Sequence, residues 1–286
     1  MNLDSIGGQG LFGVYGGSIL ADGSTVEINN VDTLINKDNT FSASIKNLNS
    51  TLYIDAEYFY NYDKENSRGG GRLEHNGENA QTTIDGSFYN IGLNSGVQGR
   101  EEAIVQVYNG KFNVTGDFIN GKNDPYATSD YYGKGNLYVK QGAVMTIDGN
   151  FLSDSQGASS PTGISLVDLN NSSLVVKGKF DVYRSNIYLT EMAKIYTTDF
   201  YLDSSARLYF VGSNLGFGYI NASSSATFNG SVSFKLTGSL LKNDDMSYLI
   251  LDTPLLQGST LREGKVTVLD STGQTLTNYI TEIVKK

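Results

Sequence analysis

The sequence of 286 residues has no cysteine, no tryptophan, three prolines and a single histidine, His75. Without cysteine the chain has no disulfide bonds, thiolate metal sites or cysteine nucleophiles. With one histidine it has no catalytic or metal centre made of several imidazoles. Basic residues are also few, because 21 Lys and Arg face 30 Asp and Glu, giving a formal charge of −9. Such a chain repels phosphate backbones, so nucleic acid is not expected as a partner.

Long apolar runs are missing as well. No window approaches the roughly 18 consecutive apolar residues that a membrane helix needs. Residues 1–8 lack the basic and apolar regions of a secretory signal. An intact cytosolic protein is compatible with these features. The complete lack of cysteine, however, suits a protein that crosses an oxidising compartment unfolded. We therefore expect a segment of a longer secreted protein.

What the sequence does contain is a repeat, found by comparing it with itself. The pattern is apolar, any, apolar, any, Gly, any, Phe. The complete copies are Thr82–Phe88, Phe112–Phe118, Met145–Phe151 and Leu174–Phe180. Two degenerate copies are Leu52–Tyr58, with Ala56 and Tyr58 in the Gly and Phe positions, and Ala226–Val232, with Gly230 and Val232. From Ala56 to Gly178 the glycine position recurs at spacings of 30, 30, 33 and 29 residues.

Each copy follows another short strand pattern. Residues 103–107, 136–140 and 165–169 alternate apolar and polar side chains, and a polar turn rich in Asn, Ser or Gly comes next. Alternation with period two indicates a strand, and no stretch of ten residues carries a helical stripe. The sequence therefore predicts an all-β protein.

The recurrence of one residue type at one phase favours a solenoid over a sandwich, in which every strand has its own environment. The phenylalanines at 88, 118, 151 and 180 recur in this way, and so do the aliphatic residues Ile84, Val114, Ile147 and Val176. Chance recurrence in a Gly- and Phe-rich chain is the alternative. We predict a parallel β-helix of roughly ten coils over residues 1–241. Residues 242–286 are expected to form a cap or the terminal strands.

These features together resemble the passenger regions of bacterial autotransporters (type V secretion), above all the vacuolating-cytotoxin-like group. The likeness rests on the repeated strand ends, the Asn- and Ser-rich turns, the missing cysteine and the stretch Ser247–Asp252. It covers residues 50–286. It implies a right-handed parallel β-helix that is secreted or displayed on the outer membrane of a Gram-negative cell. Contact with the membrane would then occur only through a C-terminal barrel outside this sequence.

Candidate catalytic residues are sparse. His75 lies in the polar run Arg72–Asn79 and is expected to be a solvated loop histidine, and no Gly-x-Ser-x-Gly elbow occurs. Asp85 and Asp148 occupy the same repeat position, which favours a hydrogen-bonding role in a turn over catalysis. We therefore expect no enzyme activity, no cofactor and no metal.

The repeats contain extra residues, which we call insertions, at positions 61–81, 120–135 and 152–163. Insertions at one phase of a solenoid project from one side, and such faces commonly bind partners. Aromatic and basic residues in or beside them are candidates for surface recognition, although core packing and plain surface decoration are equally compatible with the pattern. These candidates are Tyr60, Tyr62, Arg68, Arg72, Tyr126, Tyr131 and Tyr132.

The leading hypothesis is a non-enzymatic, toxin-like or adhesive segment that binds a host-cell surface protein or glycan, or associates with like chains. The alternatives are a β-helical polysaccharide-active enzyme, a phage tail-fibre segment and a passive stalk. An enzyme should show acidic and basic residues from several coils clustered in one groove.

Overall fold

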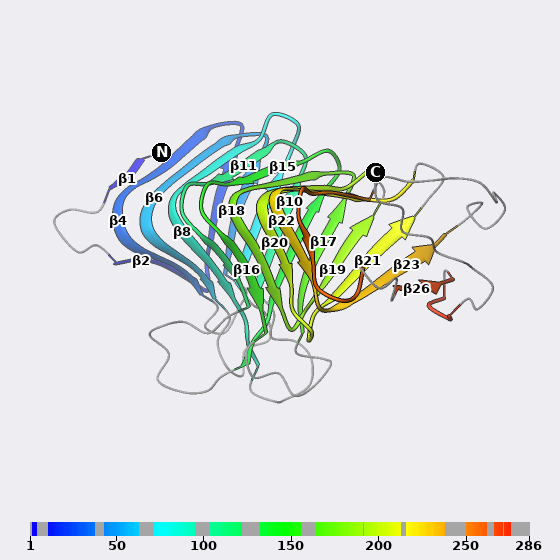
Figure 1. Cartoon of the computed structure of the whole chain (residues 1–286). Coiled ribbons are helices and arrows are strands. Elements are labelled where there is room, and N and C mark those ends of the chain that lie inside the picture. The colour runs from blue at the N-terminus through cyan, green and yellow to red at the C-terminus, as the bar shows by residue number, and fades with distance from the viewer. Residues whose placement is uncertain are drawn as a thin grey trace.

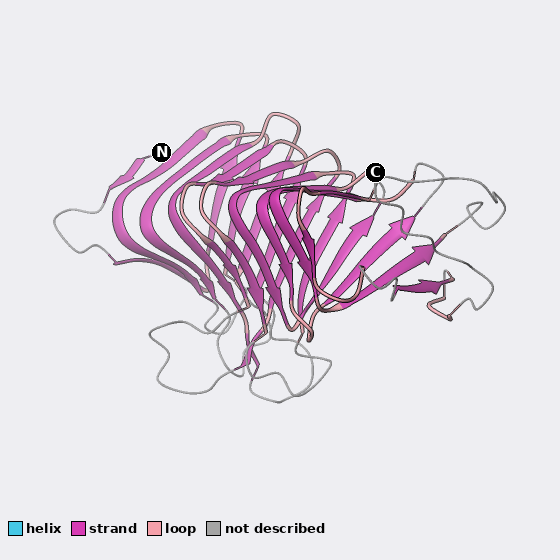
Figure 2. Cartoon of the chain, viewed as in Figure 1, coloured by secondary structure: helices cyan, strands magenta, loops and turns pink. Residues whose placement is uncertain are grey.

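The computed structural model describes most of the chain and every regular element in the described part is a β-strand (Figure 2). Among the described residues no helix is long and apolar enough to cross a membrane. The described residues are 2–4, 11–37, 43–62, 71–94, 103–121, 132–155, 164–190, 192–212, 216–237, 250–261, 266–270 and 272–275.

The strands form two large parallel sheets, which we call sheet A and sheet B. Sheet B contains β3 (Ser18–Asp22), β5 (Ser44–Leu48), β7 (Arg72–Asn76), β10 (Ala103–Tyr108), β14 (Gly135–Lys140), β17 (Ser165–Asn170), β19 (Ser185–Thr190), β21 (Arg207–Gly212), β23 (Ser231–Leu236) and β26 (Val266–Leu269). Sheet A contains β1 (Asn2–Asp4), β2 (Leu11–Tyr15), β4 (Thr25–Lys37), β6 (Thr51–Tyr62), β8 (Gln81–Ile91), β11 (Lys111–Val114), β12 (Phe118–Asn120), β15 (Val144–Ile147), β16 (Phe151–Asp154), β18 (Ser173–Tyr183), β20 (Lys194–Leu202), β22 (Tyr219–Phe228), β24 (Leu251–Asp252) and β25 (Leu256–Gln257).

The chain runs alternately through the two sheets. Each coil has one strand of sheet B, a short turn, and then a bent strand or strand pair of sheet A, and the next coil stacks on it in parallel register. Figure 1 shows this as a continuous colour sequence along the stack. Since sheet B has ten strands, the coils number ten in the described part. The prediction of an all-β parallel β-helix is confirmed, and β24, β25 and β26 continue both sheets.

The predicted phenylalanine stack runs through the core. Phe88, Phe118, Phe151 and Phe180 pair in register on adjacent coils and are fully buried. Their ring centroids lie 4.9, 5.5 and 4.4 Å apart. Phe200 continues the column at 5.4 Å from Phe180. Rings at these spacings add offset-stacking contacts to the burial of apolar area.

The repeat glycines lie where sheet A bends, and the backbones of successive coils touch there. A Cβ on Gly116 would lie 2.7 Å from the Gly86 carbonyl carbon, and one on Gly149 would lie 2.7 Å from the Gly116 oxygen. The same glycines bond to each other, with Gly116 N–H donating to the Gly86 carbonyl at 2.9 Å. The repeat therefore needs glycine at this position because the backbones of adjacent coils approach too closely for a side chain.

Both degenerate repeat copies were aligned wrongly from sequence. In the first, a bulge between Asp55 and Tyr58 shifts the register, so Phe59 pairs with Phe88 and takes the stack position. Tyr58 pairs with Ser87 instead. In the second, Val232 lies in β23 of sheet B, where it pairs with Leu208 rather than with a sheet A phenylalanine. A one-residue bulge leaves no mark on the spacing of a short motif.

The prediction for His75 was also wrong. This residue lies in β7 with its side chain fully buried in the core, and its Nδ1 is 2.8 Å from the Thr82 hydroxyl. Its ring meets Phe112 edge-on with centroids 5.7 Å apart. The polar residues around it in sequence are the outward positions of an alternating strand. Alternation places His75 inside because its neighbours Glu74 and Asn76 face outward.

Candidate functional site

The predicted insertions leave the helix from one corner, where sheet A ends and sheet B begins. The first insertion, predicted at residues 61–81, was predicted too long, because Arg72–Asn76 within it is strand β7. Only residues 63–70 of that connection lie outside the described part of the chain. A fourth insertion, residues 95–102, was missed. At this corner β9 (Leu93–Asn94) pairs antiparallel with β13 (Tyr132–Gly133), so connections of neighbouring coils are joined.

Beneath this corner lies a ladder of buried asparagines that sequence reasoning overlooked. The Nδ2 of Asn36 donates to Asn61 Oδ1, Asn61 donates to Asn90, and Asn90 donates to Asn120, each at 2.8 Å. Asn120 then donates to the Ser153 hydroxyl at 3.3 Å. The signal was present in the sequence as Phe-x-Asn in three successive coils, at Phe59–Asn61, Phe88–Asn90 and Phe118–Asn120.

Each ladder amide also bonds to the chain where it returns from the insertion. Asn61 Nδ2 donates to the Gly71 carbonyl at 3.0 Å, and Asn120 Nδ2 donates to the Gly135 carbonyl at 3.0 Å. Asn90 Nδ2 reaches the Ala103 carbonyl at 3.2 Å. These bonds hold the base of each insertion against the core, so the insertions are anchored on a rigid frame.

The recognition residues predicted from sequence do not form one described surface. Tyr60 is only 5 % exposed and stacks on Tyr89 with centroids 4.8 Å apart, so it is not available for a surface contact. Tyr62 is half-buried, with the Lys37 ammonium 4.9 Å from its ring centroid. Both belong to a small cluster on the outer face of sheet A.

The remaining predicted residues are separated from that cluster. Arg72 lies on the outer face of sheet B, where it bonds to Gln106 and has Glu74 3.9 Å away. The backbone of Tyr132 belongs to β13. Arg68, Tyr126 and Tyr131 lie outside the described residues. Recognition by these residues therefore stays a prediction.

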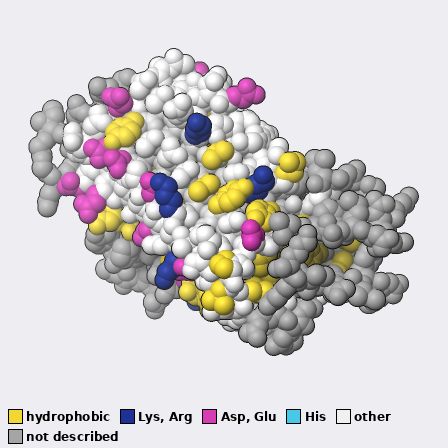
Figure 3. Space-filling view, turned by 45° about the horizontal axis from the view of Figure 1, so that its top comes forward, with side chains coloured by type: hydrophobic (Ala, Val, Ile, Leu, Met, Phe, Trp, Pro, Cys, Tyr) yellow, Lys and Arg dark blue, Asp and Glu magenta, His cyan; other side chains and the backbone are white. Residues whose placement is uncertain are grey.

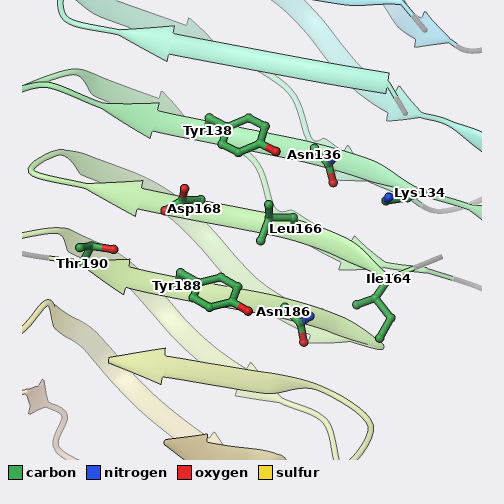
Figure 4. A pocket seen from close by; sticks show the side chains of 9 residues that line it. All are labelled: Lys134, Asn136, Tyr138, Ile164, Leu166, Asp168, Asn186, Tyr188 and Thr190. Atoms are coloured by element: carbon green, nitrogen blue, oxygen red, sulfur yellow. The ribbon is translucent and has the colours of Figure 1, made fainter. Parts of the chain in front are cut away.

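A different site is formed on the outer face of sheet B. A shallow groove of about 550 Å³ crosses β14, β17 and β19 (Figure 4). It is lined by Lys134, Asn136, Tyr138, Ile164, Leu166, Asp168, Asn186, Tyr188 and Thr190. The inward residues between them, such as Leu137 and Ile187, are fully buried. The groove thus has a rigid floor made of the sheet itself.

Parallel register places the groove residues in columns. Tyr138, Asp168, Tyr188 and Tyr209 pair successively across four adjacent strands. Since strands lie about 4.8 Å apart, Tyr138 and Tyr188 are separated by roughly 10 Å along the stack. Figure 4 shows both rings lying over the sheet, with their hydroxyl groups toward Asn136 and Asn186. Tyr209 extends the aromatic surface, because it stacks on Tyr188 with centroids 4.6 Å apart and planes 8° apart.

The one carboxylate of the groove lining is ion-paired, and Lys134 adds a cation to the lining. Lys140 Nζ lies 2.5 Å from Asp168 Oδ2 and also 5.0 Å from the Tyr138 ring centroid. Burial raises the pKa of Tyr188, and the neighbouring Tyr209 and Asp168 raise it further, whereas Arg207 lowers it. The tyrosine hydroxyl is therefore neutral at physiological pH and can donate or accept a hydrogen bond.

The groove does not carry the paired carboxylates of a polysaccharide-cleaving centre. Among its lining residues Asp168 is the one carboxylate, and it is bonded to Lys140. Within the described ranges no group of three or more His, Cys, Asp or Glu could hold a metal ion. Asp85 instead accepts hydrogen bonds from Thr115 and Tyr53 at 2.7 and 3.1 Å. The predicted hydrogen-bonding role is confirmed, but the residue lies within strand β8 and not in a turn.

Figure 3 shows another view of the surface. Hydrophobic side chains, which include tyrosines in this colouring, gather over the middle and lower part of the described face, and most of the acidic side chains lie toward its left. No known protein family, curated protein or solved structure matches this chain.

Proposed function

We propose that this chain is a non-enzymatic segment of a secreted or surface-displayed bacterial autotransporter passenger, and that it binds the surface of host cells. The likeness of its repeats to such passengers supports the origin. A cysteine-free chain of Asn- and Ser-rich coils fits export in an unfolded state. The parallel β-helix is the architecture expected for that class.

The observation that carries the binding role is the tyrosine groove on sheet B. It presents aromatic and polar side chains from three coils on a rigid, hydrogen-bonded floor. Tyrosine gives a large contact area at low conformational cost, and its hydroxyl adds a directed hydrogen bond. The single ion-paired carboxylate in the lining favours binding without catalysis.

The test is binding of the fluorescently labelled protein to epithelial cells over a concentration series. We expect saturable binding that is displaced by unlabelled protein. The double variant Tyr138→Ala, Tyr188→Ala should lose it while keeping the far-UV circular dichroism of the parent. Both side chains point away from the core, so the fold is expected to survive their removal.

The matched control is Tyr196→Ala, which removes a tyrosine from the outer face of sheet A in β20. It should bind cells like the parent. A second variant with residues 122–131 replaced by a Gly-Ser linker of equal length tests the insertion corner. Absence of saturable binding by the parent protein would contradict the adhesive function. Loss of binding only in the linker variant would move the site to the insertions.

A further inference from the structure

We infer that the ligand of the sheet B groove is an oligosaccharide chain that runs along the helix axis, across β14, β17, β19 and β21. This inference rests on the proposed binding function and names the chemical class that the groove fits. The groove lining in Figure 4 comes from successive coils, so its side chains repeat along the stack and suit a ligand with its own repeat.

The strands under the groove limit how a ligand can bond to this face. Each groove strand is already paired on both sides, since β14 lies between β10 and β17, and β19 lies between β17 and β21. No strand edge is therefore open in the groove for an added peptide strand. Recognition has to come from side chains alone, and that removes the main source of affinity for an extended polypeptide.

The order of side chains in the central column fits a sugar chain. Along the axis a ligand meets the ring of Tyr138, then the carboxylate of Asp168, then the stacked rings of Tyr188 and Tyr209. A pyranose ring has apolar C–H faces that pack on an aromatic ring and a rim of hydroxyls that hydrogen-bond to carboxylates and amides. An alternation of flat rings with planar polar groups matches those two surfaces.

Polar side chains lie on either side of that column. Asn136 and Asn186 lie on one side, toward the tyrosine hydroxyls, and Thr190 lies on the other (Figure 4). Because Lys140 pairs with Asp168 at 2.5 Å, the carboxylate is held in place as a hydroxyl acceptor and does not select for cations. Lys134, the other charged residue of the lining, is a further hydrogen-bond donor for hydroxyl groups. Uncharged hydrogen-bonding groups around a few rings provide orientation, and the rings provide contact area.

The experiment first asks whether the cell ligand is a glycan. Cells are treated with periodate, which cleaves vicinal diols in sugars, or with trypsin, and binding of the labelled protein is measured again. In parallel the protein is applied to an array of defined oligosaccharides, and the affinity for the strongest member is measured by titration calorimetry. We expect binding that periodate abolishes and that at least one oligosaccharide reproduces.

The variants then assign the contact to the groove. Tyr188→Ala should weaken oligosaccharide binding about tenfold, the loss of one stacking contact. Tyr188→Phe keeps the ring and should change the affinity by less than about threefold, and Tyr196→Ala should leave it unchanged. Asp168→Asn should lower affinity if its oxygens accept hydroxyl protons, while the aromatic contacts remain.

The outcomes separate this inference from the function on which it rests. Cell binding that resists periodate, is destroyed by trypsin and depends on Tyr188 identifies a protein ligand and overturns the inference while the adhesive function stands. Oligosaccharide binding without cell binding keeps the inference and rejects the adhesive function. Oligosaccharide binding that is unchanged in Tyr188→Ala, or no binding to either target, overturns the inference.

Discussion

The coils from β5 to β16 and those from β17 to β20 differ at one inward position, two residues after the stacked phenylalanine. In the first region this position holds a polar residue, and in the second it is aliphatic. The register-equivalent residues are Asn61, Asn90, Asn120 and Ser153 in the first region, and Val182 and Leu202 in the second. All are buried.

The difference follows the path of the chain. After Asn61 the chain returns to sheet B only at Arg72, whereas after Val182 strand β19 already begins at Ser185. The asparagine amides donate hydrogen bonds to the carbonyls of Gly71, Ala103 and Gly135, where the chain enters sheet B after a long connection. They tie the base of that connection to the core. Where the coil closes directly, no such connection has to be held, and an aliphatic residue fills the position. The comparison teaches that insertions in this helix require a polar position in the core.

The strongest test of this difference is to remove the central asparagine of the ladder. Asn90→Val takes away the amide that bonds to Asn61, Asn120 and the Ala103 carbonyl. Because several buried polar groups lose a partner at once, we expect a loss of about 4 kcal/mol in unfolding free energy. Urea denaturation followed by tyrosine fluorescence measures it, since the chain has no tryptophan.

The control is Asn170→Val, which changes the same residue type on the outer face of β17. Its effect should stay within about 0.5 kcal/mol. If the two substitutions were equally mild, the ladder would not stabilise the first region.

A second polar position in the first region makes its stability depend on pH. Burial lowers the pKa of His75 to about 4 from 6.5, although the Asn109 carbonyl opposes the shift. The unfolded chain therefore binds a proton at a higher pH than the folded one. The stability that depends on a neutral, buried His75 is therefore constant above pH 6.5 and is lost as the pH falls toward 4. This lowers the unfolding free energy by about 3 kcal/mol.

The measurement is unfolding free energy between pH 7.5 and 4, compared with His75→Val. Valine is the residue at the paired position 107 in the next coil. Since carboxylates also titrate in this range, the relevant quantity is the difference between the two proteins. Parallel curves for both would show that His75 does not contribute.

The reverse substitution tests the second region. Val182→Asn places an amide in the ladder column of a coil that closes directly into β19. With no returning chain to bond, the buried amide should cost about 2 kcal/mol. Val182→Leu, which copies Leu202 of the next coil, should stay within about 1 kcal/mol. A harmless Val182→Asn would mean that this column tolerates polar groups regardless of insertions.

The smallest effect is expected from the insertions themselves. Replacing residues 63–70 with eight Gly and Ser residues keeps the length of the connection, and its base stays closed by Asn61 and Gly71. We expect a change below about 1 kcal/mol in unfolding free energy. A larger loss of unfolding free energy would show that the inserted residues themselves stabilise the β-helix.

Much of the core could be predicted because a solenoid repeats one environment. Phe88 and Phe118 occupy equivalent places, so the spacing of the motif reveals the stack without knowledge of the fold. The ladder was equally visible as Phe-x-Asn, but a buried amide reads as a polar surface residue until its partners are known. His75 was misplaced for the same reason, since its polar neighbours in sequence suggested a loop.

The groove could not be predicted from the sequence. Tyr138, Asp168 and Tyr188 belong to strands of different coils, separated by connections of different length. No local motif marks them, because only the register of stacked strands brings them into one column. Tyr60 was predicted to be exposed for recognition, but its side chain is buried against the neighbouring Tyr89 ring although it points outward from the sheet.

The sequence by itself determined the parallel coils, the phenylalanine stack and the glycine bend, because each depends on residues that recur at nearly constant spacing and meet their own copies. Only the tertiary structure decided which alternating positions face outward together, where a bulge shifts Phe59 into the stack, and that three coils form a groove. Those features depend on the register between coils. Register is set by the packing of every side chain in the core at once.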